Sequence, residues 1–321
     1  MTRTLFKAAI GALTAAVACT SAQATSLTFF ETQFDTDFVA VGIGGMRNGS
    51  GNATLNLAGV SGSVSKAYLF WHGPSNITQT PETANANVSF AGTNISGTFL
   101  GISDNNCWGF ANSVAYRADV TSLVTGNGNY ALANFIKPNA QINGASLIVF
   151  FDDGNAANNR DVVMFNGNDS NIDNPFDTPG WNITLAGINY SNGTASAQFH
   201  VADGQTFVDA AVIANGTTTL APAGAVFNGV FAQNGGSGFP GNGLLWDIRD
   251  FDITSLLNPG LNSVNITSGV NSDCLSCLMI AIDLPAGAAP PPPNGVPEPG
   301  SFALLASALL AGFGATRVRR T

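Results

Sequence analysis

Cysteines are the first residues of this chain that could carry chemistry. Four occur, and Cys19 lies in an apolar N-terminal run, which leaves Cys107, Cys274 and Cys277 in the body. Disulfides persist in an oxidising compartment, and an odd number leaves at least one thiol without an intrachain partner. The alternatives are a bridge from Cys107 to Cys274, a local bridge from Cys274 to Cys277, and a redox or metal pair. Cys277 leads into an expected strand, and no further thiol or histidine lies close by in sequence, so every interpretation favoured here is structural.

Histidine chemistry has few options, because only His72 and His200 occur. The chain contains no Gly-x-Ser-x-Gly elbow and no His-Glu-x-x-His segment, so we interpret both imidazoles as structural. A pair of aspartates for glycoside hydrolysis needs only to meet in space, and nothing in the spacing selects one.

Two Asp- and Asn-rich loops place carboxylate and amide oxygens close together. Their members are Asp152, Asp153, Asn155, Asp161, Asp169, Asn171 and Asp173. Calcium binds about six to eight hard oxygens, which a compact loop of this kind can supply, so calcium is the one cofactor that the sequence suggests. The helix-loop-helix calcium pattern is not met, since Gly180 stands at its twelfth position. The alternative is that these residues close turns between strands.

Four tryptophans could stack on sugar rings. Trp71 ends an apolar run and is expected in the core, whereas Trp108 and Trp181 lie among loop residues and are expected to be more accessible; Trp246 completes the set. Buried anchoring remains the commoner role of Trp in β-sandwiches.

The body is acidic and poor in helix-forming residues. Five of the 11 cations lie in the two ends of the chain, and one of the 20 acids does, so six cations face 19 acids in between. The cations are isolated singles, which excludes nucleic acid as a partner. Gly, Asn, Ser, Thr, Val and Phe dominate, which is typical of strands joined by turns.

Short apolar runs bounded by Gly, Asn or Pro predict an all-β body with an internal repeat. The matched runs are Lys66–Gly73 with Arg160–Gly167, Val88–Gly92 with Ile183–Gly187, Asp119–Leu123 with Asp252–Leu256, and Ala145–Phe151 with Cys277–Ile282. The two runs of each of the last two pairs are separated by more residues than those of the first two pairs, which implies an insertion in the second copy between Gly187 and Asp252. The apolar run from Ser146 to Phe151 predicts a strand buried on both faces. Short helical turns are expected where Asp119 and Asp252 precede Thr-Ser-Leu.

We therefore predict two tandem domains of β-sandwich or jelly-roll type that arose by internal duplication. Residues 25–153 form the first and residues 154–285 the second. The alternative is one larger sandwich built from two pseudo-symmetric halves. Residues 286–295 are rich in proline and are expected to form an extended linker.

Residues 1–24 have the composition of a secretory signal peptide. Arg3 and Lys7 precede an apolar run, and Ala22-Gln23-Ala24 is a small-x-small site, which predicts cleavage after Ala24 by signal peptidase. A lipoprotein signal with Cys19 as the lipidated residue is the alternative. In such signals the residue three positions before the lipidated cysteine is normally a larger aliphatic, whereas this chain has Ala16 there.

Residues 296–321 begin with Val296, Pro297, Glu298 and Pro299, continue in an apolar stretch, and end in three arginines. Such a stretch followed by cations acts as a stop-transfer segment, although it is short for a lasting membrane span. These residues resemble the PEP-CTERM sorting signal of Gram-negative bacteria. The resemblance implies cleavage near Glu298 by an exosortase, brief retention in the inner membrane, and release to the cell surface or extracellular matrix.

The body resembles an uncharacterised family of secreted β-domain proteins. The shared features are the strand Ala67–Trp71, the segment beginning at Asp119 with a Gly-Asn-Gly turn at 126–128, and the strand Gly144–Val149. Together the sequence features predict an exported, non-enzymatic protein with a structural or adhesive role in a polysaccharide-rich envelope or biofilm. The alternative is a secreted polysaccharide hydrolase that uses a pair of aspartates.

Overall fold

A computed structural model describes residues 26–47, 51–176, 180–235 and 243–289. These residues form 18 β-strands and three short 3-10 turns and contain no α-helix, so the prediction of an all-β chain is confirmed. No helix among them is long and apolar enough to cross a membrane.

The strands divide into two sets of nine. The first set is β1 (Thr28–Gly44), β2 (Ala53–Leu57), β3 (Ser63–Ser75), β4 (Asn87–Phe90), β5 (Thr93–Ser96), β6 (Thr98–Ser103), β7 (Asn112–Asp119), β8 (Gly128–Ala133) and β9 (Gly144–Asp152). The second set is β10 (Arg160–Ser170), β11 (Trp181–Tyr190), β12 (Ser196–Ala202), β13 (Val212–Ala214), β14 (Thr218–Ala221), β15 (Gln233–Asn234), β16 (Trp246–Asp252), β17 (Gly260–Ser268) and β18 (Ser276–Pro285). The 3-10 turns are η1 (Pro81–Thr83), η2 (Thr121–Leu123) and η3 (Thr254–Leu256).

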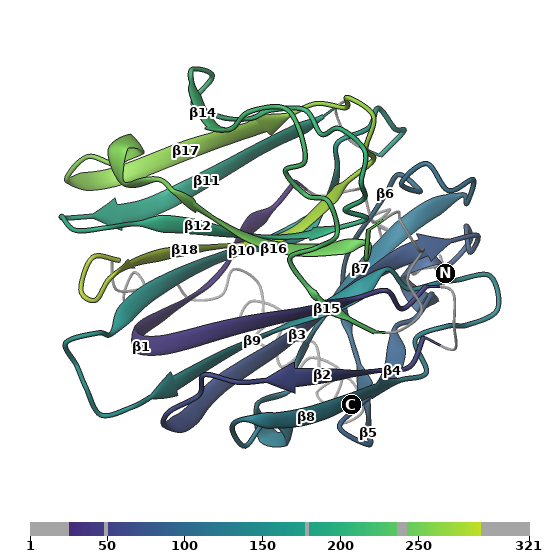
Figure 1. Cartoon of the computed structure of the whole chain (residues 1–321), viewed down its shortest axis with the longest axis horizontal. Helices are drawn as coiled ribbons and strands as arrows, with labels where there is room; N and C mark the ends of the chain where they lie inside the picture. Colours follow the sequence, from purple (N-terminus) through teal and green to yellow (C-terminus); the bar gives the residue numbers. More distant parts are fainter. Residues whose placement is uncertain (1–25, 48–50, 177–179, 236–242, 290–321) are drawn as a thin grey trace, which may run out of the picture.

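A ten-stranded sheet runs through the centre of the molecule and is folded on itself at β1. The order is β16-β12-β18-β10-β1-β9-β3-β7-β6, with β15 also paired to β1. Residues Thr28–Thr36 of β1 pair with β10, and Asp37–Ile43 pair with β9. Asp35 lies at the change of partner with a φ of 50°. One long strand therefore belongs to both inner layers of the fold (Figure 1).

Two outer sheets complete a stack of four layers. The sheet β2-β8-β4-β5 covers the inner layer built from β9, β3 and β7, and the sheet β11-β17-β13-β14 covers the layer built from β10, β18 and β12 (Figure 1). Each stacking buries its own apolar cluster, as expected for sheets packed face to face. The β-sandwich architecture is therefore present twice.

The two inner layers also pack against each other. Their shared apolar cluster consists of Tyr68, Phe70, Ile148, Phe150, Val162, Met164, Met279 and Ala281. Alternate residues of β3 accordingly face two different cores, since Leu69 and Trp71 belong to the outer-facing cluster and Phe70 to the central one. Leu147 to Phe151 of β9 are all buried, which confirms the predicted strand with two buried faces.

The connectivity of the first nine strands is repeated by the last nine. β2-β8-β4-β5 has the same order as β11-β17-β13-β14, and β1-β9-β3-β7 has the same order as β10-β18-β12-β16. β6 and β15 depart from this rule, because β6 pairs with β7 whereas β15 pairs with β1. An origin of this repeat by duplication, and the domain boundary after residue 153, stay predictions.

The sequence alignment of the repeat was wrong in its first two matches. The counterpart of β3 by topology is β12, whereas the sequence matched it to Arg160–Gly167 in β10; β4 corresponds to β13 and was matched to Ile183–Gly187 in β11. The later two matches agree with the topology, and no long insertion is needed to align the second set of strands with the first. Apolar runs closed by glycine occur in many strands of a layered fold, so this pattern does not discriminate among them.

The predicted short turns after Asp119 and Asp252 are present as η2 and η3. Asp119 Oδ1 accepts a hydrogen bond of 3.0 Å from the Thr121 N–H, and Asp252 Oδ1 accepts one of 2.8 Å from the Thr254 N–H. Both turns therefore begin in the manner that the Asp-x-Thr pattern indicated.

Candidate functional site

The polar side chains of the interior gather where the two halves of the molecule meet, and both histidines lie there. His200 of β12 is completely buried beside Ser146 of β9. Its Nδ1 lies 2.7 Å from Ser146 Oγ, and its Nε2 lies 3.1 Å from Gln198 Oε1. The Gln198 amide donates to Asp250 Oδ1 at 3.0 Å. These four side chains form a continuous hydrogen-bonded chain from the first half to the surface of the second.

The direction of each hydrogen bond in this chain follows from its last member. An ionised carboxylate only accepts, so the Gln198 amide nitrogen donates to Asp250 and its carbonyl oxygen accepts from His200 Nε2–H. Nδ1 of His200 is then the bare nitrogen and accepts the Ser146 hydroxyl proton. The geometry resembles a nucleophile beside a base. However, burial lowers the pKa of His200 to about 3, so this imidazole is a weak base at neutral pH.

A second polar group surrounds Arg47, which follows β1. Its guanidinium lies 3.6 Å from Asp203 Oδ1 at the end of β12, and both side chains are almost fully buried. The ring centroid of Trp108 is 3.7 Å from the guanidinium carbon, and the Trp108 indole N–H donates to both carboxylate oxygens of Asp203 at 2.8 Å. Asn143 donates to the same carboxylate at 3.1 Å. Burial and pairing thus make Arg47 and Asp203 an internal ion pair between the two halves.

Burial determines the protonation of the residues around Arg47. Burial lowers the pKa of Arg47 to about 10, which still leaves it protonated at neutral pH. Burial raises the pKa of Asp203, and the positive charge of Arg47 and the N–H of Trp108 oppose that rise. His72, completely buried beside Asn143, has its pKa lowered to about 3 by burial and by the charge of Arg47. His72 is therefore neutral and serves as an internal polar residue, as its position at the end of an apolar run indicated.

Three further aspartates hold irregular segments of the second half by accepting backbone N–H groups. Asp209 accepts from Val226 and Phe227 at 2.8 and 2.7 Å. Asp247 accepts from Gly229, Val230 and Phe231 at 2.8 to 3.1 Å. Asp273 accepts from Gln205 at 2.8 Å and from Cys274 at 3.0 Å.

Burial raises the pKa of Asp209 to about 6 and those of Asp247 and Asp273 to about 7, despite these donors. The charge of Asp209 also raises the pKa values of Asp247 and Asp273, and the charge of Asp247 raises the pKa of Asp273. They therefore share one poorly solvated region of the molecule.

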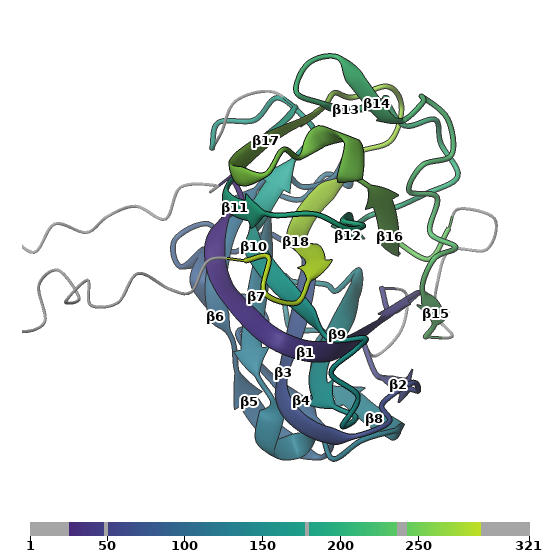
Figure 2. The same ribbon diagram turned by 90° about the vertical axis from the view of Figure 1, so that its left-hand side faces the viewer.

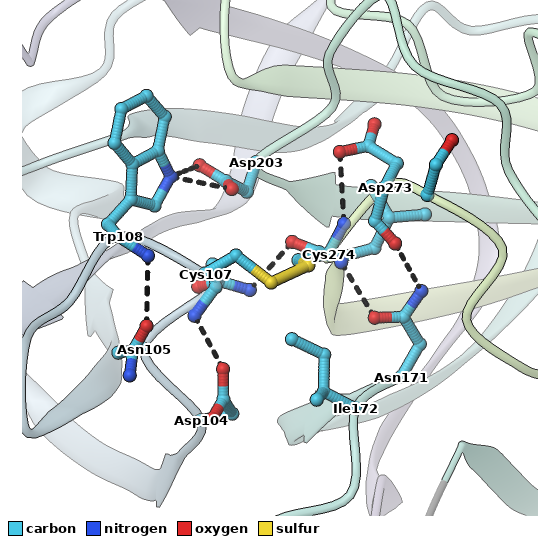
Figure 3. Close-up of a disulfide and its surroundings, with 12 residues drawn as sticks. Asp104, Asn105, Cys107, Trp108, Asn171, Ile172, Asp203, Asp273 and Cys274 are labelled. Atoms are coloured by element: carbon cyan, nitrogen blue, oxygen red, sulfur yellow. Dashed lines mark hydrogen bonds between the residues drawn. A yellow bond between two sulfur atoms is a disulfide. The ribbon is translucent and has the colours of Figure 1, made fainter.

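A disulfide joins the two halves next to these groups (Figure 3). Cys107 is bonded to Cys274 with a Cα–Cα distance of 6.0 Å and a sequence separation of 167 residues, and Cys277 is a buried free thiol. The local bridge from Cys274 to Cys277 is therefore not formed. Asn106 adds hydrogen bonds of 3.0 Å from its side-chain amide to Cys274 O and Ser276 Oγ.

The residues predicted to bind calcium lie in two separate places, as the two loops of the sequence imply. Asp152, Asp153 and Asn155 each accept a backbone N–H two residues further on and so close successive turns. Asp161 and Asp169 lie at opposite ends of β10, about 26 Å apart at ~3.3 Å per residue. No group of three or more His, Cys, Asp or Glu in the described part of the chain has the geometry of a metal site.

Three of the remaining four members of that set also have structural partners. Asp161 accepts N–H groups of Asp35 and Ala289, both at 2.9 Å. Asp169 pairs in register with Cys277 and is buried, and Asn171 accepts from Leu275 N at 2.8 Å. Asp173 is exposed.

The tryptophans are mostly core residues. Trp71, Trp181 and Trp246 are buried, so the expectation that Trp181 is accessible was wrong. It begins β11 and packs edge-on against Phe227, with ring centroids 5.7 Å apart. Trp108 is partly exposed, but Arg47 covers one face of its ring.

The residues assigned to export lie outside the described residues. They are Ala22 and Ala24 at the signal cleavage site, and Val296, Pro297, Glu298 and Pro299 in the sorting motif. Sequence reasoning missed the Ser146–His200 and Arg47–Asp203 groups, whose members are single residues with no shared motif.

Comparisons with known proteins identify one matching family. Among solved structures, an isomalto-dextranase from Arthrobacter globiformis T6 complexed with panose matches at 12% identity with a TM-score of 0.25, covering 72% of this chain and 34% of that chain. The present chain therefore spans about a third of the length of that chain. A comparison with curated proteins gave no match. The family described as "Protein of unknown function (DUF3344)" matches residues 58–282, which is most of the chain, and the protein therefore belongs to the DUF3344 family.

Proposed function

We propose that this protein is exported and acts outside the cell as a structural or adhesive component of a polysaccharide-rich surface layer or matrix. The observation that carries the export part is the disulfide between Cys107 and Cys274. Such bonds persist in extracytoplasmic compartments and are rare where thiols are kept reduced. The signal-like residues 1–24 and the PEP-CTERM-like residues 296–321 support the same route.

The way in which the two halves are joined supports a durable, non-catalytic role. They share β1, a central apolar cluster, an internal ion pair and a covalent bridge. Both imidazoles lie in the interior with pKa values of about 3. These features favour a protein that keeps its shape outside the cell over one that performs acid-base chemistry with histidine.

Export is tested by expressing the chain with both of its ends in a bacterium that carries an exosortase. We expect the mature protein in the surface or medium fraction, with Thr25 at its N-terminus and with the chain cut near Pro299, as measured by mass spectrometry. The matched control is Glu298→Ala, which is expected to leave the C-terminal segment uncleaved and the protein in the membrane fraction. Recovery of the uncut chain from the cytosol contradicts the proposal.

A second candidate function is hydrolysis of a polysaccharide by a pair of aspartates. The observation that favours it is the contact of Asp209 with Asp273, whose pKa values of about 6 and 7 lie in the range of a general acid. Both residues are at most 1% exposed, which prevents contact with a polymer in this conformation. Release of reducing sugar that is lost in Asp209→Asn would establish the second function and displace the first.

A further inference from the structure

Two surface hollows flank the same strand of the second half. β16 is the edge strand of the ten-stranded sheet, and the segment that leads from β14 to β15 descends along it (Figure 2). The first hollow is lined by residues 218–226 together with residues 249–252 and Ser255. The second is lined by residues 40–42 of β1, residues 230–233, Gln198, Ile248 and Asp250. Asp250 belongs to the lining of both hollows, so they are neighbours along β16, and together they are called the groove.

An exposed aromatic ring stands in this groove. The side chain of Phe231 is 43% exposed although its backbone N–H is anchored by Asp247 at 2.9 Å. The Arg249 guanidinium lies 4.5 Å from the Phe231 ring centroid and 5.4 Å from that of Phe251, and it donates to Val226 O at 2.6 Å. The position of the Phe231 ring is thus fixed by the hydrogen bond at its backbone and by its contact with the Arg249 guanidinium. No ion pair within 4 Å is formed by Arg249 in the described structure, so its remaining N–H groups can serve a ligand.

The polar groups of the groove are oriented in advance. Asp250 is exposed, and Gln198 holds it through the chain that runs inward to His200 and Ser146. Asp252, two residues along the same edge strand, is exposed and held by the Thr254 N–H at 2.8 Å. Residues two apart on a strand lie on one face, so the two carboxylates share one face of β16.

We propose that this groove binds one strand of a neutral polysaccharide. The Phe231 ring offers an apolar surface to a pyranose face, while Asp250, Asp252 and Arg249 accept from and donate to sugar hydroxyls. A shallow site with one apolar platform and a few fixed polar groups suits a hydroxyl-rich polymer, whereas a peptide anchor needs a deep apolar pocket. The excess of acids over cations in the body repels anionic polymers. This inference rests on the proposed role at a polysaccharide-rich surface and names the polymer class for it.

The test is affinity electrophoresis of the purified full chain in native gels containing dextran, hydroxyethyl cellulose, galactomannan or alginate. We expect retardation by at least one of the three neutral polymers and none by alginate. Phe231→Ala is expected to weaken that binding by about tenfold or more, and Asp250→Asn to weaken it as well. The matched control is Leu261→Ala, which truncates an exposed apolar side chain at the start of β17 outside the groove.

Thermal melting of each variant shows that it is folded before its binding is compared. Absence of retardation by every neutral polymer overturns the inference, as does equal binding by wild type and Phe231→Ala. Stronger retardation by alginate overturns the choice of a neutral ligand. Each of these results leaves the fractionation test of export unaffected, so the two proposals fail separately.

Discussion

Arg47 and Asp203 show at the scale of single residues what joins the two halves. Both side chains are buried, Arg47 lies beside Asp203, and Asp203 also accepts hydrogen bonds from Trp108 and Asn143. Removing one member leaves an uncompensated charge in a poorly solvated place, which costs more than the pair itself contributes. His200 is a neutral counterpart, because both of its ring nitrogens have hydrogen-bond partners, Ser146 and Gln198, that take the place of water.

We expect Arg47→Met to lower the free energy of unfolding by about 3–5 kcal/mol, because the Asp203 charge then stays buried without its partner. Lys66→Met is the control, since the ion pair of Lys66 with Asp119 at 2.9 Å is partly exposed and should be worth only about 0–1 kcal/mol. Urea unfolding followed by Trp fluorescence measures both. Equal losses in the two variants would falsify the buried-pair assignment.

Neither histidine should titrate in the physiological range. With pKa values of about 3, His72 and His200 stay neutral, and His200 carries its proton on Nε2 because Gln198 Oε1 accepts there. Nitrogen-detected NMR of the imidazoles between pH 5 and 8 should show unchanged shifts and, for His200, a protonated Nε2. Titration of either ring near its ordinary value would contradict the burial described here.

At the scale of elements, the Asp-x-Thr turns close each inner layer at equivalent places. Thr121 Oγ accepts from Ala67 N at 3.0 Å within β3, and Thr254 Oγ accepts from Ala195 N at 2.9 Å just before β12. Val120 N donates to Ala67 O, and Ile253 N to Ala195 O, at 2.9 and 3.0 Å. The turn is therefore joined to the backbone of the equivalent strand segment by the same two bonds in both halves.

Thr121→Val and Thr254→Val should each destabilise the fold by about 1–2 kcal/mol, because a buried N–H loses its acceptor. Thr→Ser at the same positions keeps the hydroxyl and should retain most of the stability. Chemical denaturation of the four variants makes the comparison. If Val and Ser substitutions cost the same at either site, the hydroxyl is not the stabilising group.

The bridge between the β6–β7 connection and the segment before β18 should contribute about 2–4 kcal/mol, since it constrains a very long loop in the unfolded chain. The double variant Cys107→Ser with Cys274→Ser measures this by its melting temperature.

The mature chain should hold one free thiol, Cys277, which burial keeps unreactive until the protein is denatured. Rapid labelling of the native protein with a thiol reagent would argue against this assignment.

At the scale of the whole molecule, the acid cluster makes stability depend on pH. The folded pKa values of Asp209, Asp247 and Asp273 are raised to about 6, 7 and 7 from the ordinary value of 3.8, so the folded state binds more protons than the unfolded state between these limits. The contribution of these groups is fully present below about pH 4 and is lost as the pH rises through 6 to 7. Asp119, with a pKa lowered to about 2, acts in the opposite sense below pH 4.

The melting temperature should therefore rise when the pH is lowered from 8 to 5 and fall again under strongly acid conditions. Asp273→Asn removes one buried charge from the cluster, and the slope between pH 5 and 8 should become flatter. Differential scanning calorimetry across this range provides the measurement. If the melting temperature instead falls steadily as the pH is lowered from 8 to 5, the acid cluster does not control the pH dependence of stability.

Much of the architecture follows from the order of residues, because strand periodicity and turn chemistry are local. The run from Ser146 to Phe151 predicts a doubly buried strand, and Asp before Thr-Ser-Leu predicts a short turn, since neighbouring residues create both patterns. Matching Lys66–Gly73 to the wrong strand shows the limit of this reasoning. An apolar run closed by glycine records that a strand is buried but not which neighbours it has.

The amino-acid sequence by itself therefore determined an all-β, acidic chain with short turns and a small set of cysteines. Only the tertiary structure decided that Arg47 meets Asp203, that Ser146 meets His200 across 54 residues, and that Cys107 meets Cys274 across 167. Such contacts depend on how β1 folds the central sheet and brings its two inner layers face to face. Because each partner is a single residue with no local pattern, long-range packing alone selects which side chains share a buried space.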